Sequence, residues 1–188
     1  WGESCVERFR GMFAFAVWDR NHEILFLARD RLGIKPLYYA RLADGCFIFG
    51  SELKSLKVHE SLPREIDPTA VEEYFAFGYV PEPKTIYKRV YKLPPGFRLT
   101  LRRGIEQMRP EQYWDAAVSS GSPISESAAG SELIERFEEA VRIRMIAEVP
   151  LGAFLSGGVD SSAVVAAMAK ESDDPVNTCS ISFGDPKF

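Results

Sequence analysis

The chain has 188 residues, of which 46% are hydrophobic and 27% are charged, as in ordinary globular proteins. Its formal charge of −4 is mild, and no Lys/Arg cluster is long enough to indicate nucleic-acid binding. No apolar run approaches the roughly 20 residues that span a bilayer, and the first residues lack a signal-type segment. The sequence therefore favours a cytoplasmic protein that binds neither nucleic acid nor membrane.

The cysteines and histidines argue against metal and hydrolase chemistry. Cys5, Cys46 and Cys179 form no Cys-x-x-Cys pair, so a metal site or a disulfide framework is not expected. His22 and His59 lie in polar, turn-like surroundings, where histidines usually face solvent. We therefore expect no Ser-His-Asp or Cys-His hydrolase within these residues.

The first half of the chain predicts a strand-rich domain. Two apolar runs, residues 11–18 and 23–28, flank a polar turn and predict a hairpin. Because apolar and polar residues alternate only weakly in them, both strands should be covered on two faces, as in a layered sandwich. Residues 29–39 contain a Gly/Pro turn before a further strand. Residues 45–50 predict another strand, and residues 51–56 a short helical segment.

A helix with clear end signals follows. Asp67 can cap its N-terminus and Pro68 suits the first helical position. The helix is predicted to run through Phe77 and to stop at Gly78. After a Pro/Gly turn, residues 97–101 alternate as a strand.

The composition changes beyond this domain. Residues 119–131 are rich in serine and lack apolar surface, which predicts an interdomain linker. From Leu133 to Val141, apolar residues recur at helical spacing with charged residues on the other face. This pattern predicts an amphipathic helix that covers a core and ends at Pro150.

Residues 151–183 predict a strand, a tight loop, a helix and a second strand, which together form a βαβ unit. Two adjacent glycines in the loop allow positive φ and close approach of a ligand. The loop hydroxyls and the free N–H groups of the first helical turn are expected to point at one spot. That spot suits a phosphate or pyrophosphate; a glycine-rich turn without a ligand is the alternative. The loop reads Ser156-Gly157-Gly158-Val159-Asp160-Ser161-Ser162.

Asp160 narrows the choice of ligand. The loop is neither a Walker A sequence nor a dinucleotide fingerprint nor a nucleophile elbow. A carboxylate beside an anion site is repulsive unless a cation bridges the two, and Mg²⁺ does so with one or two carboxylates and phosphate oxygens. The loop and Asp160 together predict a Mg²⁺–pyrophosphate group, and hence ATP.

The loop resembles the PP-loop of the N-type ATP pyrophosphatases. Residues 11–16, 29–38 and 51–54 resemble the class II glutamine amidotransferase domain of glutamine-dependent asparagine synthetases, which have the same domain order. The resemblance implies an α/β fold class with an α+β first part. Residues 1–116 would be the C-terminal part of the glutaminase domain, a partial Ntn-type αββα sandwich, and residues 117–130 the linker. Residues 131–188 would be the N-terminal part of the asparagine synthetase (PP-loop) domain, with the first βαβ of a parallel-sheet adenine-nucleotide α-hydrolase-like domain.

The resemblance also implies a reaction. Aspartate would be amidated to asparagine with ATP and glutamine-derived ammonia, through a β-aspartyl-AMP intermediate. The small-molecule partners would be glutamine, aspartate and ATP, and a homodimer is left open. The metal ligand for Mg²⁺ would be Asp160. The ATP-binding residues would be Leu155, Ser156, Gly157, Gly158, Val159, Asp160, Ser161, Ser162 and Phe183.

Four residues of the first half have both a functional and a structural interpretation. Met12 and Glu52 would lie near the domain interface, on the route of ammonia, or would serve packing and a surface ion pair. We expect Arg29 and Asp30 to form a structural ion pair that fixes the turn, in preference to a catalytic role.

The sequence departs from the family pattern in two places. Its first residue is not the nucleophilic cysteine, and it has no Asn-Gly-Glu segment to hold glutamine. We therefore expect an internal piece of a longer enzyme, with neither glutaminase activity nor asparagine synthesis of its own. Two alternatives stay open: a related amidotransferase with another acceptor (a glycan, a secondary metabolite or a β-lactam precursor), and a non-catalytic nucleotide-binding module.

Overall fold

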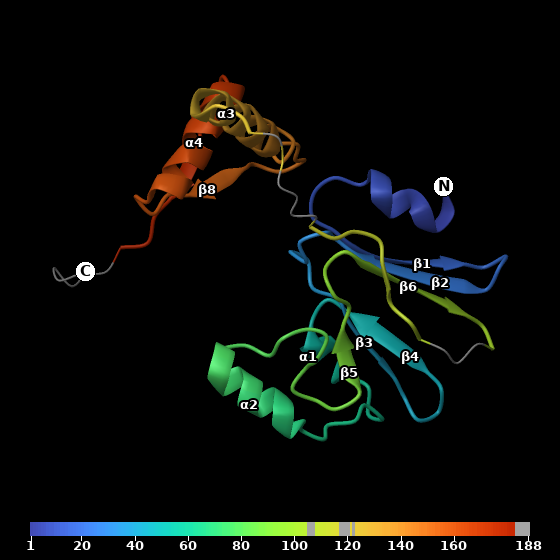
Figure 1. Cartoon of the computed structure of the whole chain (residues 1–188). Helices are drawn as coiled ribbons and strands as arrows, with labels where there is room; N and C mark the ends of the chain where they lie inside the picture. The colour runs from blue at the N-terminus through green and yellow to red at the C-terminus, as the bar shows by residue number, and fades with distance from the viewer. Residues whose placement is uncertain (105–107, 117–120, 122, 183–188) are drawn as a thin grey trace. The chain divides into compact units, whose positions relative to one another are not determined.

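The computed structural model describes residues 1–104, 108–116, 121 and 123–182 (Figure 1). The chain forms two compact units, Trp1–Val118 and Ser119–Phe188. No helix in the described ranges is long and apolar enough to cross a membrane.

The first unit contains two antiparallel sheets (Figure 1). The predicted hairpin is confirmed, because β1 and β2 pair antiparallel with Phe15 opposite Ala28. One sheet has the order β1-β2-β6-β7, and the other has the order β4-β3-β5. The strands of the first sheet are β1 (Ala14–Asp19), β2 (Ile24–Arg29), β6 (Phe97–Arg102) and β7 (Glu111–Gln112). Those of the second are β3 (Tyr38–Arg41), β4 (Phe47–Gly50) and β5 (Val90–Lys92).

The main core lies between the two sheets. Leu27 of β2 and Leu99 of β6 have no exposed surface, and they share a cluster with Tyr39 of the other sheet. Tyr39 in turn contacts Phe47 and Tyr91, with ring centroids 5.9 and 5.7 Å apart. The two sheets are therefore joined by apolar side chains from both facing surfaces, as in a sandwich.

The outer face of the first sheet is only partly covered. Val6 of the 3₁₀ helix η1 (Gly2–Arg8) packs on Phe26 and Ala28, so β2 is covered on both faces as predicted. The same prediction is wrong for the end of β1, where Val17 and Trp18 are about half exposed. As an edge strand, β1 pairs with a neighbour on one side only, which leaves the side chains at its end open to solvent.

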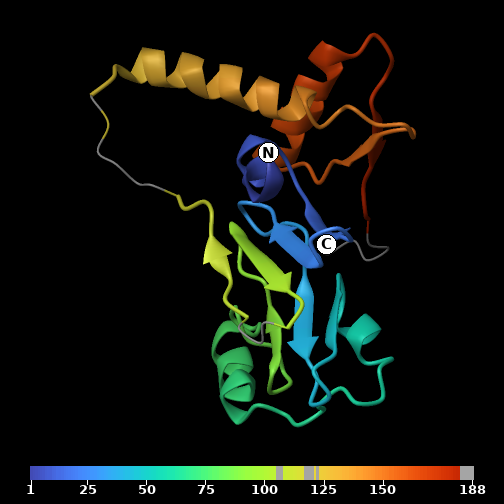
Figure 2. The same ribbon diagram turned by 90° about the vertical axis from the view of Figure 1, so that its right-hand side faces the viewer.

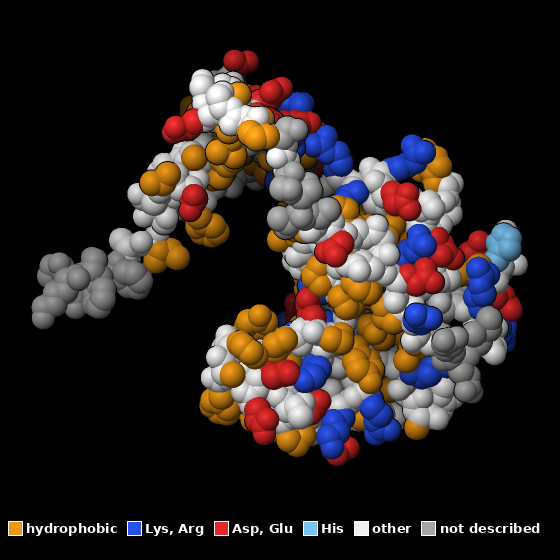
Figure 3. Space-filling view, viewed as in Figure 1, with side chains coloured by type: hydrophobic (Ala, Val, Ile, Leu, Met, Phe, Trp, Pro, Cys, Tyr) orange, Lys and Arg blue, Asp and Glu red, His pale blue; other side chains and the backbone are white. Residues whose placement is uncertain are grey.

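The second sheet is covered by α1 (Leu53–Leu56), whose Leu56 packs on Ala40 and Val90. The α2 helix (Pro68–Phe77) follows, with the predicted ends confirmed. The Asp67 carboxylate accepts the N–H of Thr69 at 3.0 Å, and Gly78 ends the helix with φ of 78°. Ala70 is the one buried residue of α2, and Figure 3 shows hydrophobic side chains on the surface over this helix.

In its described residues, the second unit contains two helices and a parallel pair of strands (Figure 2). The elements are α3 (Glu126–Arg142), β8 (Gly152–Phe154), α4 (Val159–Glu171) and β9 (Asn177–Cys179). The predicted strand–helix–strand order is confirmed, with β8 parallel to β9. A small core of Val141, Ala167 and Met168 joins α3 to α4.

The α3 helix differs from its prediction at both ends. It begins at Glu126, inside the predicted linker, because Ser125 acts as the N-cap and accepts the N–H of Ala128 at 3.2 Å. It ends at Arg142 and does not reach Pro150. There the N–H groups of Arg144 and Met145 bond to carbonyls three residues back, which closes the last turn tightly.

Candidate functional site

The glycine–serine loop connects the end of β8 to the start of α4 (Figure 1). Leu155 extends the pairing with β9 by one bond, since its N–H donates to the carbonyl of Cys179 at 2.9 Å. The loop therefore leaves the sheet at the carboxyl end of a parallel strand. Ligand sites of parallel α/β structures lie at this end of the strands.

The two glycines of the loop have different conformations. Gly157 has φ of 82°, a left-handed conformation that favours glycine, as predicted. Gly158 has φ of −76° and ψ of 161°, so the prediction of positive φ is wrong there. The reason is that Gly158 is the N-cap of α4, and N-cap residues are extended.

Two of the three loop hydroxyls meet. The Oγ atoms of Ser156 and Ser161 lie 3.1 Å apart. The Ser161 hydroxyl donates to the carbonyl of Gly158 at 3.1 Å and accepts the N–H of Ser156 at 3.3 Å. The side chain of Ser162 is exposed and has no described hydrogen bond, although its N–H makes the first helical bond to Gly158. The structure thus brings Ser156 and Ser161 together but not Ser162.

The start of α4 can receive an anion. No side chain caps it, so the first N–H groups of this 13-residue helix have no side-chain partner. Val159 and Asp160 are both exposed there. Free amides and the helix dipole together attract negative charge, and the small loop residues leave the approach open.

Asp160 fits a magnesium ion only together with a ligand that brings further oxygen atoms. Its carboxylate lies in the first turn of α4, on the surface. Among the described residues, no group of three His, Cys, Asp or Glu side chains could hold a metal ion. Mg²⁺ usually takes one or two carboxylates plus phosphate oxygens and water, and one carboxylate beside an anion site meets that pattern.

An apolar cleft of about 500 Å³ adjoins the loop. Ser161 and Val164 of α4 line it together with Phe154 of β8 and Val141 of α3. Leu155, predicted to border adenosine, is half-buried at the end of β8. Its predicted partner Phe183 lies outside the described residues.

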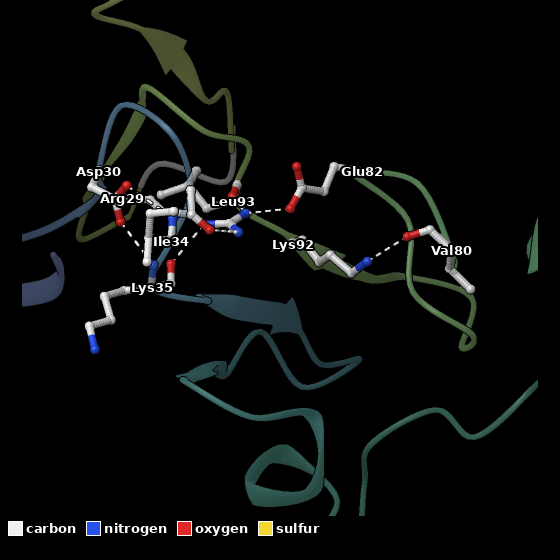
Figure 4. A network of polar contacts seen from close by, with 9 residues as sticks. Arg29, Asp30, Ile34, Lys35, Val80, Glu82, Lys92 and Leu93 are labelled. Carbon is white, nitrogen blue, oxygen red and sulfur yellow. Dashed lines mark hydrogen bonds and ion pairs between the residues drawn. The ribbon is translucent and has the colours of Figure 1, made fainter. Parts of the chain in front are cut away.

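In the first unit, Arg29 and Asp30 do not pair with each other, so the predicted ion pair is wrong (Figure 4). The Arg29 guanidinium bonds to Glu82 at 2.6 Å and to the carbonyl of Leu93 at 2.6 Å. The Asp30 carboxylate accepts the backbone N–H groups of Phe13, Ile34 and Lys35. Successive side chains at a strand end point in opposite directions, which separates the two groups. Both hold the turn, in keeping with the structural role.

Met12 and Glu52 line one cleft of about 590 Å³, with Lys35 beside them. Glu52 also forms an ion pair with Lys54 at 2.6 Å, and both of these side chains are more than half exposed.

Burial, offset in part by Glu82, lowers the pKa of Lys92, whose ammonium donates to the Val80 carbonyl at 2.5 Å.

Sequence reasoning missed two further contacts. Glu82, the partner of Arg29, lies 53 residues away in the chain. The Ser180 hydroxyl, just after β9, donates to the Leu155 carbonyl at 2.6 Å. The only available signal was a serine directly after a strand that flanks the loop.

Two known protein families match the chain, one in each of its two parts. Residues 1–114 match the family described as glutamine amidotransferase domain, and residues 132–188 match the family described as asparagine synthase. The chain is 43% identical to the putative asparagine synthetase (glutamine-hydrolyzing) 2 of Methanocaldococcus jannaschii, over 97% of this chain and 36% of the relative. It is 35% identical to asparagine synthetase (glutamine-hydrolyzing) 3 of Bacillus subtilis, over 97% of this chain and 30% of the relative.

A relative with a different name is amidase chyE of Penicillium rubens, 35% identical over 90% of this chain and 25% of the relative. The chain therefore spans about a third or less of the length of these curated relatives.

Proposed function

Since the chain belongs to the glutamine amidotransferase domain family and its residues 132–188 match the asparagine synthase family, we propose that it serves an ATP-dependent synthesis of asparagine. Glutamine would supply the ammonia and aspartate would accept it. The observation that carries the proposal is the loop between β8 and α4, which combines an uncapped helix N-terminus, Gly157 at positive φ and two serine hydroxyls 3.1 Å apart.

In this proposal, different loop residues bind different parts of ATP. The backbone of Gly157, Gly158 and Val159 leaves room for the pyrophosphate part, and the exposed hydroxyl of Ser162 is available to donate to it. The Ser156 hydroxyl donates to Ser161 and would exchange that bond for one to the pyrophosphate. Ser161 is engaged with the loop itself, so it shapes the site. Asp160 would hold Mg²⁺, which would neutralise phosphate charge when bound. Leu155 would border the adenosine, and so would Phe183, which lies outside the described residues.

The proposed chemistry is an adenylation followed by a displacement. The aspartate side-chain carboxylate attacks the α-phosphorus of ATP, and the bond to pyrophosphate breaks. Ammonia then attacks the acyl carbon and AMP leaves. The helix dipole and the free amides of α4 favour the negative charge that develops on the departing pyrophosphate.

We propose that the first unit is part of an Ntn-type glutaminase domain and the second the start of an adenine-nucleotide α-hydrolase-like domain. The two stacked antiparallel sheets and the parallel β8–α4–β9 unit support these assignments. The cleft lined by Met12 and Glu52 would belong to the route of ammonia.

The test is ATP–pyrophosphate exchange by the protein that carries this chain. We expect exchange that requires aspartate, and a loss of at least about tenfold in Asp160→Asn, because its carboxylate no longer holds the metal. The matched control is Asp173→Asn, an exposed aspartate beyond the other end of α4, which should leave exchange unchanged. Exchange that requires a different carboxylic acid would contradict the aspartate assignment. Binding of ATP with no exchange for any carboxylic acid would favour a non-catalytic module.

A further inference from the structure

The peptide group between Leu155 and Ser156 is held from both of its sides. The Ser180 hydroxyl donates to its carbonyl at 2.6 Å, and the Ser161 hydroxyl accepts its N–H at 3.3 Å. A peptide group is planar and trans, so its C=O and N–H point in opposite directions. Two bonds at these opposite ends fix the rotation of the whole plane.

This peptide group is the first of the loop, so its rotation sets the direction in which the chain leaves β8. Gly157 then turns with φ of 82°, and Gly158 begins α4. The two hydroxyls come from the two elements that flank the loop: Ser180 follows β9, and Ser161 lies in the first turn of α4.

The Ser180 hydroxyl acts where the parallel pairing ends. Leu155 donates its N–H to Cys179, and continued pairing would bring the N–H of Ile181 to the Leu155 carbonyl. In the described part of the chain no backbone N–H bonds to that carbonyl, and the Ser180 side chain takes this place. At this position the loop is therefore attached to Ser180 through a side chain and not to Ile181 through its backbone.

We propose that Ser180 is a positioning residue for the phosphate loop. Through the Leu155 carbonyl it holds the Leu155–Ser156 peptide in the orientation that presents the loop to a pyrophosphate group before the ligand arrives. The inference rests on the proposed function of the loop. Ser180 itself does not touch the ligand in this proposal.

The test compares Ser180→Ala with Ser180→Thr in the 188-residue chain. The first readout needs no ligand: amide hydrogen exchange at Ser156, followed by NMR. We expect Ser180→Ala to speed this exchange several-fold, while the amides in the middle of α4 keep their rates, because one net hydrogen bond is lost locally. Ser180→Thr, which keeps the hydroxyl, should restore the original rate.

The second readout is the dissociation constant of pyrophosphate in the presence of Mg²⁺. We expect about a three- to tenfold weaker affinity in Ser180→Ala, the loss that one net hydrogen bond produces. The matched control is Ser172→Ala, which removes a hydroxyl bonded to the Asp174 carbonyl at 3.1 Å beyond the other end of α4. It should change neither readout.

The outcomes separate this inference from the proposed function. Unchanged exchange at Ser156 in Ser180→Ala, an equal effect of Ser172→Ala, or no restoration by Ser180→Thr would overturn the positioning role. Faster exchange spread evenly over α4 would overturn it too, since it would report lost stability. If the unaltered chain binds no pyrophosphate, the proposed function of the loop fails, and exchange at Ser156 still decides whether Ser180 positions the peptide.

Discussion

Asp30 is a buried carboxylate, and no lysine or arginine side chain among the described residues pairs with it. It is 1% exposed, and it accepts backbone N–H groups of Phe13, Ile34 and Lys35 at 3.3, 3.0 and 2.9 Å. Three such donors compensate a buried negative charge, because hydrogen bonds to an ionised group are stronger than neutral ones. Asp30 thereby ties the start of β1 to the turn before β3.

Asp30→Asn should lower the free energy of unfolding of the first unit by about 2 kcal/mol. Whichever way the amide turns, its NH₂ group faces at least one of these N–H donors. The measurement is urea unfolding followed by tryptophan fluorescence, which reports this unit because all three tryptophans, Trp1, Trp18 and Trp114, lie in it. Asp44→Asn, which alters an exposed carboxylate that accepts the N–H of Cys46, is the control and should have little effect. If Asp30→Asn and Asp44→Asn lowered the free energy of unfolding equally, the burial of Asp30 would not explain its contribution.

Because of Tyr39, the free energy of unfolding of the first unit should change with pH in the alkaline range. Burial, with a smaller contribution from Tyr91, raises the pKa of Tyr39 from 10.0 to about 12. The folded state therefore holds this proton when the unfolded chain has already lost it. The resulting stabilisation is complete below about pH 10 and is lost as the pH rises towards about 12.

Between about pH 9 and about pH 11, the chain should lose roughly 1 kcal/mol more stability than Tyr39→Phe, which has no proton to lose at this position. Urea unfolding of both proteins at the two pH values measures the difference. Identical losses would show that the Tyr39 hydroxyl ionises equally easily in the folded and unfolded states.

Elements with local chemical signals were predictable, and those that depend on distant partners were not. Asp67 and Gly78 gave both ends of α2, because a cap and a left-handed glycine act within one turn. The strands β5 and β7 were missed, since these short segments are defined by pairing with β3 and β6. The early start of α3 was missed because Ser125 lies among many serines and only one of them caps.

The candidate site was likewise predictable where it depends on local sequence and not where it depends on distant residues. The loop and the positive φ of Gly157 follow from local sequence. The bond from Ser180 to Leu155 spans 25 residues and exists only once β9 pairs with β8. A serine that faces a carbonyl across two strands leaves no pattern in a single sequence.

Replacing glycine by alanine should change the free energy of unfolding in opposite directions in α2 and α3. Gly78 ends α2 with φ of 78°, whereas Gly130 lies inside α3, and a Cβ at either position meets no atom within 4 Å. Gly78→Ala should cost the first unit about 1 kcal/mol, because alanine is strained at positive φ. Gly130→Ala should stabilise the second unit by about 1 kcal/mol, because alanine is the better helix former.

Urea unfolding followed by fluorescence for Gly78→Ala and by circular dichroism for Gly130→Ala provides the measurement. A stabilising Gly78→Ala would show that α2 does not end in a left-handed residue. A destabilising Gly130→Ala would show that α3 does not extend through the predicted linker.

The two units contain cores of very different size. The first unit has three buried clusters, two of them on either side of the second sheet. Among the described residues of the second unit, one cluster of three buried side chains joins α3 to α4. Small cores stabilise weakly, so the second unit should unfold at a lower denaturant concentration. Its helices of 17 and 13 residues dominate the helical signal in circular dichroism.

Pyrophosphate with Mg²⁺ should shift only one of two unfolding transitions. At a concentration of about 100 times the dissociation constant, it should stabilise the second unit by about 2.7 kcal/mol, because the ligand binds the folded loop. The transition followed by tryptophan fluorescence should stay where it is. Equal shifts of both transitions would show that the two units unfold together, and no shift at all would contradict binding at the loop.

The position of α2 makes it an insertion site. β3 lies in the middle of the second sheet, with β4 on one side and β5 on the other. The chain leaves the sheet after β4, forms α1 and α2, and returns as β5. The bonds from Arg29 to Glu82 and from Lys92 to Val80 fasten the returning chain. Although its Glu73 pairs with Lys84 of the returning chain, α2 itself buries only Ala70, so we expect that the helix can be exchanged for a segment of other length without altering the order of the strands. A fluorescent reporter or an affinity peptide grafted between Asp67 and Gly78 would therefore label the protein in a unit other than the one that contains the phosphate loop.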